Sequence, residues 1–187
     1  MFKSNSKLLF SLIAGVAVAG VAGTFFWFGG MGNNTQTVAN DSKAMAMSSV
    51  WDKETVPNYS GVKEVTVYRS PSCGCCGEWV KHMQKHGFKI TDIKTDDMEA
   101  IKQKYNVPQN LTSCHTSIIA GYVMEGHIPA DDIKRFVASK PEQAGLAVPA
   151  MPLGTPGMEA GSKKQPFAIA SFNKDGEINI FKEYQTY

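Results

Sequence analysis

The sequence has no clear excess of charge of either sign, with 19 basic and 17 acidic side chains among 187 residues. It also lacks a basic stripe interleaved with aromatic residues, the usual signature of a nucleic-acid-binding surface. These absences exclude nucleic acid as an expected partner. The length allows one ordinary domain of about 100 to 150 residues with accessory segments.

Charge is missing altogether from one stretch near the N-terminus. No charged residue occurs between Lys7 and Asp41, and Leu8–Phe28 is an apolar run of 21 residues. This run is longer than the signal-peptide core of about 7 to 15 residues and matches the roughly 20 residues that span a bilayer. Residues 1–30 are therefore predicted to form an N-terminal transmembrane helix that anchors the chain in a membrane.

Basic residues precede this apolar run, and none follows it closely. Lys3 and Lys7 are expected to stay in the cytoplasm by the positive-inside rule, which places the remainder of the chain outside. In a bacterium the predicted location is therefore the periplasm, anchored to the inner membrane. The alternative is a signal peptide cleaved after Ala17-Val18-Ala19, which would leave a soluble periplasmic protein.

A regular hydrophobic period is absent from residues 31–60, which are rich in Gly, Asn, Thr, Ser and Ala. That composition is typical of a flexible tether. The folded domain is then predicted over residues 61–187.

Within this domain the residue patterns predict an alternation of strands and helices. Strands are expected at 64–69, 88–93, 116–120 and 122–125, and helices at 77–85, from the acidic cap at 96–99 up to Pro108, and from Pro129 to Pro141. Residues 167–173 and 177–184 flank Lys174-Asp175-Gly176, a hairpin signal. The order βαβαββα is the minimal thioredoxin-like arrangement, so we expect an α/β, thioredoxin-like domain with an added C-terminal β-hairpin.

The segment 141–166 holds five of the nine prolines. Leu146 and Val148 make it too apolar for a solvated linker. Because long loops of this kind are usually functional, we expect an extended loop that wraps over the domain.

Cysteine is scarce but concentrated, since three of the four lie within residues 70–77. Cys73 and Cys76 have the C-x-x-C spacing of a redox pair, and Cys75 adds a sulfur that a dithiol enzyme does not need. The start of a helix lowers thiol pKa values, because its unpaired backbone N–H groups stabilise the thiolate. Two purely structural disulfides are disfavoured, since bridges between near neighbours close almost no loop.

The fourth cysteine, Cys114, precedes the third predicted strand, a segment that approaches the C-x-x-C in thioredoxin-like folds. Four sulfurs select Cu(I), zinc or an iron–sulfur cluster. Structural zinc usually takes its sulfurs from two separated knuckles, which the adjacent Cys75 and Cys76 do not provide. Cu(I) accepts two or three sulfurs and can be bridged into clusters, so crowded thiolates favour copper.

Other polar side chains are candidates for the surroundings of the metal. His115, beside the fourth cysteine, is predicted to ligate, to hydrogen-bond a thiolate or to move protons, the alternative being a solvated loop histidine. His127 and, if the loop folds over the site, Met158 are further candidates. His82 and His86, four residues apart on the first predicted helix, form a weaker candidate metal face.

Several short motifs together resemble the CopG-type family of periplasmic copper-resistance proteins. They are Ser70–Cys76, Ser113–Thr116, Gly121–Pro129, Gly145–Pro149, Met151-Pro152 and Thr155–Glu159. The resemblance covers about Val65–Tyr184. Ala150 and Thr155 depart from it, because Gly and Ser are expected at those positions.

Membership of this family implies a thioredoxin-like fold and copper bound by Cys73, Cys75, Cys76 and Cys114, including as a thiolate-bridged cluster. It also implies a role in interconverting Cu(I) and Cu(II) during copper detoxification. The leading hypothesis is thus a membrane-tethered copper-binding protein that works with periplasmic copper-handling or electron-transfer proteins. The alternatives are a thiol–disulfide oxidoreductase that uses Cys73 and Cys76, and a passive structural zinc module.

Overall fold

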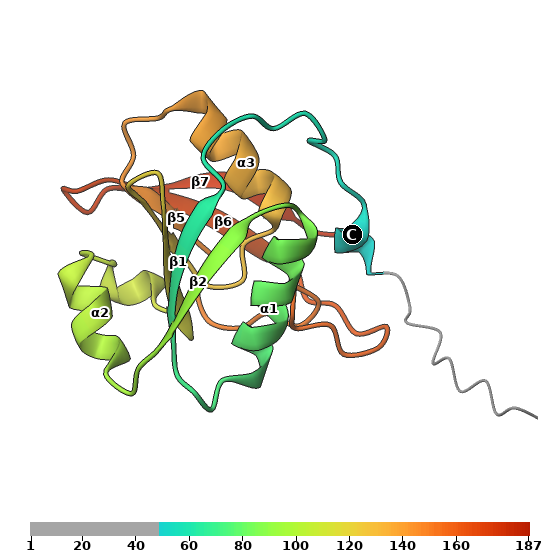
Figure 1. The fold of residues 1–187 in the computed structure, drawn as a ribbon, viewed down its shortest axis with the longest axis horizontal. Helices are drawn as coiled ribbons and strands as arrows, with labels where there is room; N and C mark the ends of the chain where they lie inside the picture. The colour runs from blue at the N-terminus through green and yellow to red at the C-terminus, as the bar shows by residue number, and fades with distance from the viewer. Residues whose placement is uncertain (1–48) are drawn as a thin grey trace, which may run out of the picture. The chain divides into compact units, whose positions relative to one another are not determined.

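The computed structural model describes residues 49–187, and these form one sheet with helices on both of its faces (Figure 1). The elements in chain order are the 3-10 helix η1 (Val50–Asp52), β1 (Glu64–Arg69), α1 (Gly74–Lys85), β2 (Lys89–Lys94), α2 (Met98–Lys104), the 3-10 helix η2 (Gln109–Leu111), β3 (His115–Ile119), β4 (Tyr122–Glu125), α3 (Ala130–Ser139), β5 (Gly145–Ala147), β6 (Phe167–Phe172) and β7 (Ile178–Tyr184). The predicted order βαβαββα followed by a hairpin is confirmed. The short strand β5 was not predicted.

The seven strands form a single sheet in the order β2-β1-β3-β4-β5-β6-β7. β1 pairs with β2 in parallel and with β3 antiparallel, and β3 and β4 form an antiparallel hairpin. β5 lies parallel to β4 and antiparallel to β6, so it joins the C-terminal hairpin β6–β7 to the rest of the sheet. The hairpin therefore extends the sheet instead of packing beside it.

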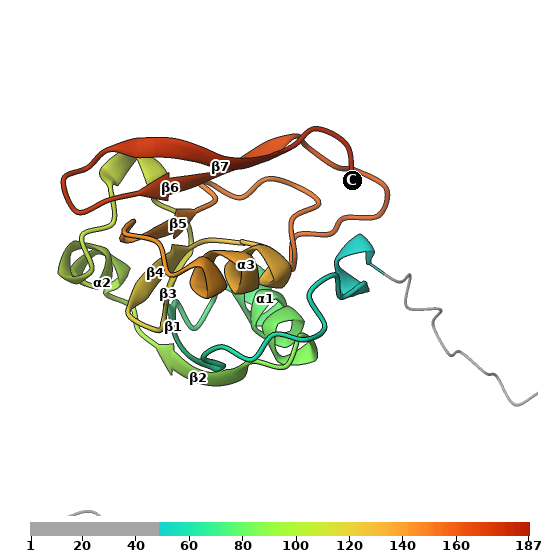
Figure 2. The same cartoon turned by 90° about the horizontal axis from the view of Figure 1, so that it is seen from above.

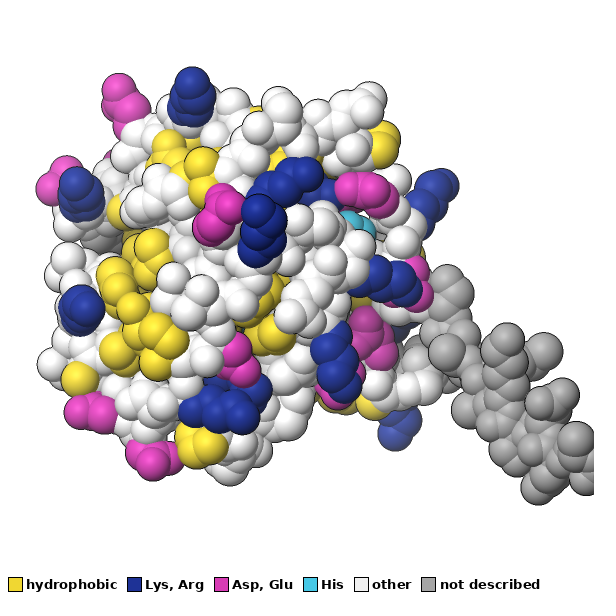
Figure 3. Space-filling model, in the orientation of Figure 1, with side chains coloured by type: hydrophobic (Ala, Val, Ile, Leu, Met, Phe, Trp, Pro, Cys, Tyr) yellow, Lys and Arg dark blue, Asp and Glu magenta, His cyan; other side chains and the backbone are white. Residues whose placement is uncertain are grey.

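Alternating residues of the central strands build two separate hydrophobic cores. Met124, Leu146 and Ile169 face the main core, to which α1 and α3 contribute. Their neighbours in the chain, such as Val123 and Ala170, face a smaller core on the side of α2. Figure 2 shows this arrangement, with α1 and α3 on one side of the strands and α2 on the other. On the surface seen in Figure 3, basic and acidic side chains are interspersed.

Helix α1 carries the cysteine cluster at its start, and its sequence explains both of its ends. Cys73 is the N-cap, and its sulfur accepts a hydrogen bond from the backbone N–H of Cys76. Trp79 and Met83 are fully buried at helical spacing, which fixes the helix against the sheet. Gly87, at a φ of 84°, takes the left-handed conformation that ends a helix at low cost. The helix begins at Gly74, three residues earlier than predicted.

The last part of the predicted tether packs against the domain. Trp51 and Tyr59 are 8 % and 9 % exposed and belong to the main core. Residues 49–60 therefore differ from the flexible segment expected over 31–60, because these two aromatic side chains bury apolar area that the composition-based prediction did not weigh. The predicted membrane segment, residues 1–30, lies outside the described residues. Within 49–187, no helix has the length and apolar character needed to cross a membrane.

Candidate metal centre

The cysteine cluster lies in the turn between β1 and α1 and in the first turn of that helix. Cys73 and Cys76 form a disulfide with their Cα atoms 5.4 Å apart, whereas Cys75 and Cys114 are free and half-buried. The sulfur of Cys75 lies 3.5 Å from that of Cys73. The pair with C-x-x-C spacing is thus the oxidised pair, and Cys75 is a third sulfur directly beside it.

The fold returns Cys114 to this cluster. Cys114 directly precedes β3, which pairs with β1, so the residue before one strand meets the loop that follows the other. The sulfurs of Cys73, Cys75, Cys76 and Cys114 all lie within 4.8 Å of one another. The structure therefore brings together the four cysteines named from the sequence, and four thiolates would be available there once the disulfide is reduced.

A buried carboxylate holds the segment that carries Cys114. Glu125, with no exposed surface, accepts hydrogen bonds from the backbone N–H of Ser113 at 2.7 Å and from its hydroxyl at 2.8 Å. Thr116 donates to the other carboxylate oxygen at 2.6 Å, and the ammonium group of Lys102 forms an ion pair with Glu125. The residues on both sides of Cys114 are thereby tied to one charged anchor.

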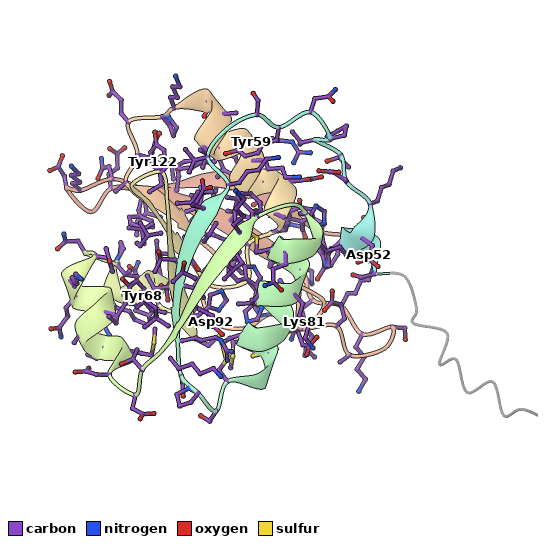
Figure 4. The ribbon with its side chains drawn as sticks, in the orientation of Figure 1. Asp52, Tyr59, Tyr68, Lys81, Asp92 and Tyr122 are labelled. Atoms are coloured by element: carbon purple, nitrogen blue, oxygen red, sulfur yellow. A yellow bond between two sulfur atoms is a disulfide. The ribbon has the colours of Figure 1, made fainter. Side chains whose placement is uncertain are left out.

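An arginine holds the opposite side of the cluster. Arg69, at the end of β1, donates to the carbonyl oxygen of Cys73 at 3.3 Å. Its other nitrogens donate to both carboxylate oxygens of Asp92 on β2, at 2.8 and 2.7 Å. Figure 4 labels Asp92 on the lower part of β2, the part nearest the start of α1. This two-point contact fixes the guanidinium group beside the cysteine loop.

Sequence reasoning missed Arg69, Lys102 and Glu125. Their roles depend on partners from distant segments, because Glu125 lies 23 residues from Lys102 and Arg69 lies 23 residues from Asp92. One local signal was present: Glu125 is a charged residue at the end of a strand that is expected to be buried. A carboxylate is rarely buried without a partner, so its position indicates a buried ion pair or hydrogen-bond network.

Two buried histidines complete the surroundings of Cys114. Its sulfur lies 3.2 Å from Nε2 of His127 and 3.6 Å from Nδ1 of His115. The N–H at Nδ1 of His127 donates to the carbonyl oxygen of Pro156 at 2.7 Å, so the neutral ring presents the lone pair of Nε2 to the thiol of Cys114. Nε2 of His115 is buried and has no hydrogen-bond partner within residues 49–187.

The histidines offer a second set of donors that shares two sulfurs with the first. Ligand atoms of Cys76, Cys114, His115 and His127 also lie within 4.8 Å of one another. Both histidines are fully buried, so neither is a solvated loop histidine. Their role as ligands or as neighbours of the ligands stays a prediction.

Burial controls the protonation of these groups. Burial, followed by the neighbouring Cys75, raises the pKa of the Cys114 thiol to about 12. Burial also lowers the pKa of His127, and it lowers that of His115 well below its ordinary value. At neutral pH the metal-free site therefore holds a protonated Cys114 thiol and two uncharged imidazoles, so a metal ion that binds Cys114 must displace the thiol proton.

The proline-rich loop covers the start of α1, as expected. At Gly157 a side chain could not be accommodated, because a Cβ atom would lie 2.6 Å from the backbone nitrogen of Trp79 and 2.8 Å from the carbonyl oxygen of Cys75. Met158, which follows, is half-buried, and its role near the metal stays a prediction. The same loop supplies the carbonyl of Pro156 that contacts His127.

The second histidine pair does not join the cluster. Nε2 of His82 accepts a hydrogen bond from the backbone N–H of Ala130 at 3.0 Å, and Nε2 of His86 lies 2.7 Å from the carbonyl oxygen of Trp51. Their rings pack 4.5 Å apart between α1 and its neighbours. This pair therefore connects α1 to the start of α3 and to η1, in place of the metal face considered from the sequence.

Comparisons with known proteins point in one direction. The family described as "Protein of unknown function, DUF411" matches residues 111–158, and a comparison with curated proteins finds no match. The solved structure titled "Copper resistance protein copG- Form 1" is 38% identical with a TM-score of 0.64, and the alignment covers 67% of this chain and 99% of the other. "Copper resistance protein copG- Form 2" is 40% identical with a TM-score of 0.62, over 65% of this chain and 97% of the other. With identity of this degree over nearly the whole of both relatives, the chain belongs to the family of the copper resistance protein CopG.

Proposed function

We propose that this protein binds Cu(I) through Cys73, Cys75, Cys76 and Cys114 and serves copper resistance by sequestering the ion. The observation that carries the proposal is the gathering of four sulfurs within 4.8 Å from two segments of the chain. Sulfur is the preferred ligand of Cu(I), and a thioether-free set of four thiolates allows one ion to be held or several to be bridged. The relatives' titles name copper resistance, which agrees with this cargo.

The disulfide adds a redox function to the proposal. Oxidation of the Cys73 and Cys76 thiols to the disulfide releases two electrons and two protons, and the electrons reduce two Cu(II) ions to two Cu(I) ions. In the reverse reaction two Cu(I) ions give one electron each to the disulfide, which takes up two protons and becomes two thiols while two Cu(II) ions form. The pair can therefore store the electrons that interconversion of Cu(I) and Cu(II) requires.

The fold assignment and the location belong to the same proposal. A thioredoxin-like core is supported by the sheet order β2-β1-β3-β4, with β1 and β2 parallel and β3 antiparallel to both neighbours. The apolar run Leu8–Phe28 and the lysines before it support anchoring to the inner membrane with the domain in the periplasm. Exchange partners there would be copper-handling or electron-transfer proteins.

A thiol–disulfide oxidoreductase is the second candidate, because the Cys73–Cys76 disulfide lies at a helix N-terminus. The two functions differ in what they require of Cys114. Disulfide exchange needs only Cys73 and Cys76, whereas the four-sulfur site loses a ligand when Cys114 is replaced.

The test uses the full chain in detergent, reduced and without oxygen, titrated with Cu(I) against a chromophoric chelator. Cys114→Ser is expected to weaken Cu(I) binding at least 100-fold, about 2.7 kcal/mol, while the rate of exchange with a small disulfide stays within about twofold of wild type. Ser72→Ala, an exposed change in the same loop, serves as the control. Unchanged Cu(I) affinity in Cys114→Ser, or displacement of Cu(I) by zinc from wild type, would contradict the proposal.

A further inference from the structure

Residues 49–55, here called the strap, run between α1, α3 and the proline-rich loop that joins β5 to β6, here called the covering loop. Lys85 forms an ion pair with Asp52 at 2.6 Å, and Figure 4 labels Asp52 beside the upper end of α1. Thr55 donates from its backbone N–H to Asp131 on α3 at 2.5 Å, and Glu54 pairs with Lys134 of the same helix. The strap is thus fixed to both α1 and α3.

Trp51 is the central contact of the strap. Its indole N–H donates to the carbonyl oxygen of Gly154 at 2.7 Å, in a buried hydrogen bond. Its own carbonyl lies 2.7 Å from Nε2 of His86, the C-cap of α1. Its ring packs edge-on against Tyr184, with centroids 5.3 Å apart. The side chain of Trp51 therefore ties the covering loop to the last strand, and its backbone carbonyl ties the same residue to the end of α1.

Residues 154–159, here called the site loop, connect this contact to the cysteines. Gly154 receives the indole N–H, and two residues later the carbonyl of Pro156 receives the Nδ1–H of His127 at 2.7 Å. Gly157 lies against the backbone of Cys75. At the end of the site loop, Glu159 accepts from the Ser49 hydroxyl of the strap at 2.8 Å and from the N–H of Gly157 at 2.7 Å.

We infer that Trp51 is a positioning residue of the copper site, which acts through the site loop on His127. The indole N–H of Trp51 fixes Gly154 and so keeps the Pro156 carbonyl in position to accept from the Nδ1–H of His127. With the proton on Nδ1, the lone pair of Nε2 points toward Cys114. Hydrogen-bond partners of this kind orient the groups at a metal site, and their loss typically costs 10- to 100-fold in metal affinity. The inference rests on the proposed function for its effect on copper, but its effect on His127 does not.

The experiment compares two substitutions in the full chain, Trp51→Phe and Tyr59→Phe. Both remove one donor from a buried aromatic side chain of the N-terminal segment, but the Tyr59 hydroxyl donates to the carbonyl of Val62, away from the site loop. Side-chain nitrogen NMR of His127 in copper-free, reduced protein reports its tautomer. Trp51→Phe is expected to mix the two tautomers and to weaken Cu(I) binding about tenfold, whereas Tyr59→Phe changes neither.

An unchanged His127 tautomer in Trp51→Phe overturns the inference, and so does an equal change in Tyr59→Phe. If Trp51→Phe does not fold, Ser49→Ala decides, since it removes the hydroxyl that donates to Glu159 and accepts from the backbone N–H of Trp51. It is then expected to speed amide exchange at Gly157 severalfold, and unchanged exchange there overturns the inference. A wild-type protein that ignores Cu(I) while the tautomer still responds to Trp51→Phe refutes the proposed function and leaves the positioning role standing.

Discussion

Glu125 accepts four hydrogen bonds without any exposure to solvent, from Lys102, Thr116 and both donors of Ser113. Glu125→Gln replaces the charge with an amide whose N–H₂ group cannot accept, and it leaves the ammonium group of Lys102 buried without a counter-charge. Breaking a buried ion pair on one side usually costs about 3 to 5 kcal/mol. We expect a loss of about 3 kcal/mol in the free energy of unfolding, measured by urea denaturation, and weaker Cu(I) binding because Cys114 is held less firmly.

Glu78→Gln is the matched control for this prediction. Glu78 also pairs with a lysine, Lys81 at 2.7 Å, but both side chains are more than half exposed to solvent. Exposed pairs contribute about 0 to 1 kcal/mol, so the control should change stability by less than about 0.5 kcal/mol. Similar losses in the two variants would show that the buried network does not hold the Cys114 segment.

His82 makes the stability of the domain sensitive to acid. Burial, followed by the neighbouring His86, lowers the pKa of His82 to about 3 from its ordinary value of about 6.5. Because the folded pKa is depressed, its contribution is present above the unfolded pKa and is lost as the pH falls from about 6.5 toward 3. Between pH 7 and pH 5 the linkage amounts to about 2 kcal/mol.

His82→Gln tests this contribution, since a glutamine oxygen can still accept from the N–H of Ala130 and does not titrate. Urea unfolding at pH 7 and pH 5 should show a stability loss about 2 kcal/mol smaller in the variant than in wild type. The buried His115 and His127 titrate in the same direction in both proteins, so they cancel in the difference. An equal pH dependence in the two proteins would rule out His82 as the cause.

Strand β5 depends on close backbone contact across the sheet. A Cβ atom at Gly145 would lie 2.0 Å from the carbonyl oxygen of Val123 and 2.9 Å from the ring of Phe172. Gly145→Ala is therefore expected to force β5 away from β4 and to lower the free energy of unfolding by roughly 2 to 4 kcal/mol. Gly74→Ala, at the first position of α1 with nothing within 4 Å, should instead be neutral or stabilise by up to about 1 kcal/mol. Amide exchange of β5 and β6 would locate the damage.

The elements that the sequence predicted are those with a local cause. The alternation of Val65 and Val67 identifies β1, and the helical spacing of Trp79 and Met83 identifies α1. β5 has only three residues in a proline-rich segment, and its existence depends on pairing with strands that are far away in the chain. The packing of Trp51 was missed for the same reason, because its partners Gly154 and Tyr184 follow more than 100 residues later.

In the candidate site, too, the features with a local cause could be predicted from the sequence, and those that depend on distant segments could not. The position of the C-x-x-C at a helix start and the order of strands and helices were enough to predict that Cys114 lies near Cys73 and Cys76. In a thioredoxin-like arrangement the segment before the third strand approaches the C-x-x-C turn. The tautomer of His127 could not be predicted, because it is set by a carbonyl from the covering loop. Neither could the anchoring by Arg69 and Glu125, whose partners are other segments' side chains.

Several elements of the domain contribute to the cysteine cluster. The first turn of α1 and its N-cap supply three cysteines, the β1–β3 pairing brings in the fourth, and the covering loop packs over the helix start. In this arrangement disulfide formation and copper binding compete, because Cys73 and Cys76 belong both to the disulfide and to the four-sulfur group. A ligand that binds only one state of the protein stabilises that state by a free energy that grows with the logarithm of the ratio of its free concentration to the dissociation constant. The rise in melting temperature on addition of Cu(I) should therefore differ between the reduced and the oxidised domain.

We expect Cu(I) to raise the melting temperature of the reduced protein by about 10 °C when its free concentration is about 1,000 times the dissociation constant, which corresponds to about 4 kcal/mol. The oxidised protein should show less than about a third of that increase, since two of its four sulfurs are committed to the disulfide. Melting curves recorded without oxygen, with and without Cu(I), measure both values. Cys73→Ser, which cannot form this disulfide, is the control, and its response to Cu(I) should be the same before and after treatment with oxidant. Equal increases for reduced and oxidised wild type would mean that copper binds away from Cys73 and Cys76, and the exchange of electrons between the disulfide and copper would then lose its structural basis.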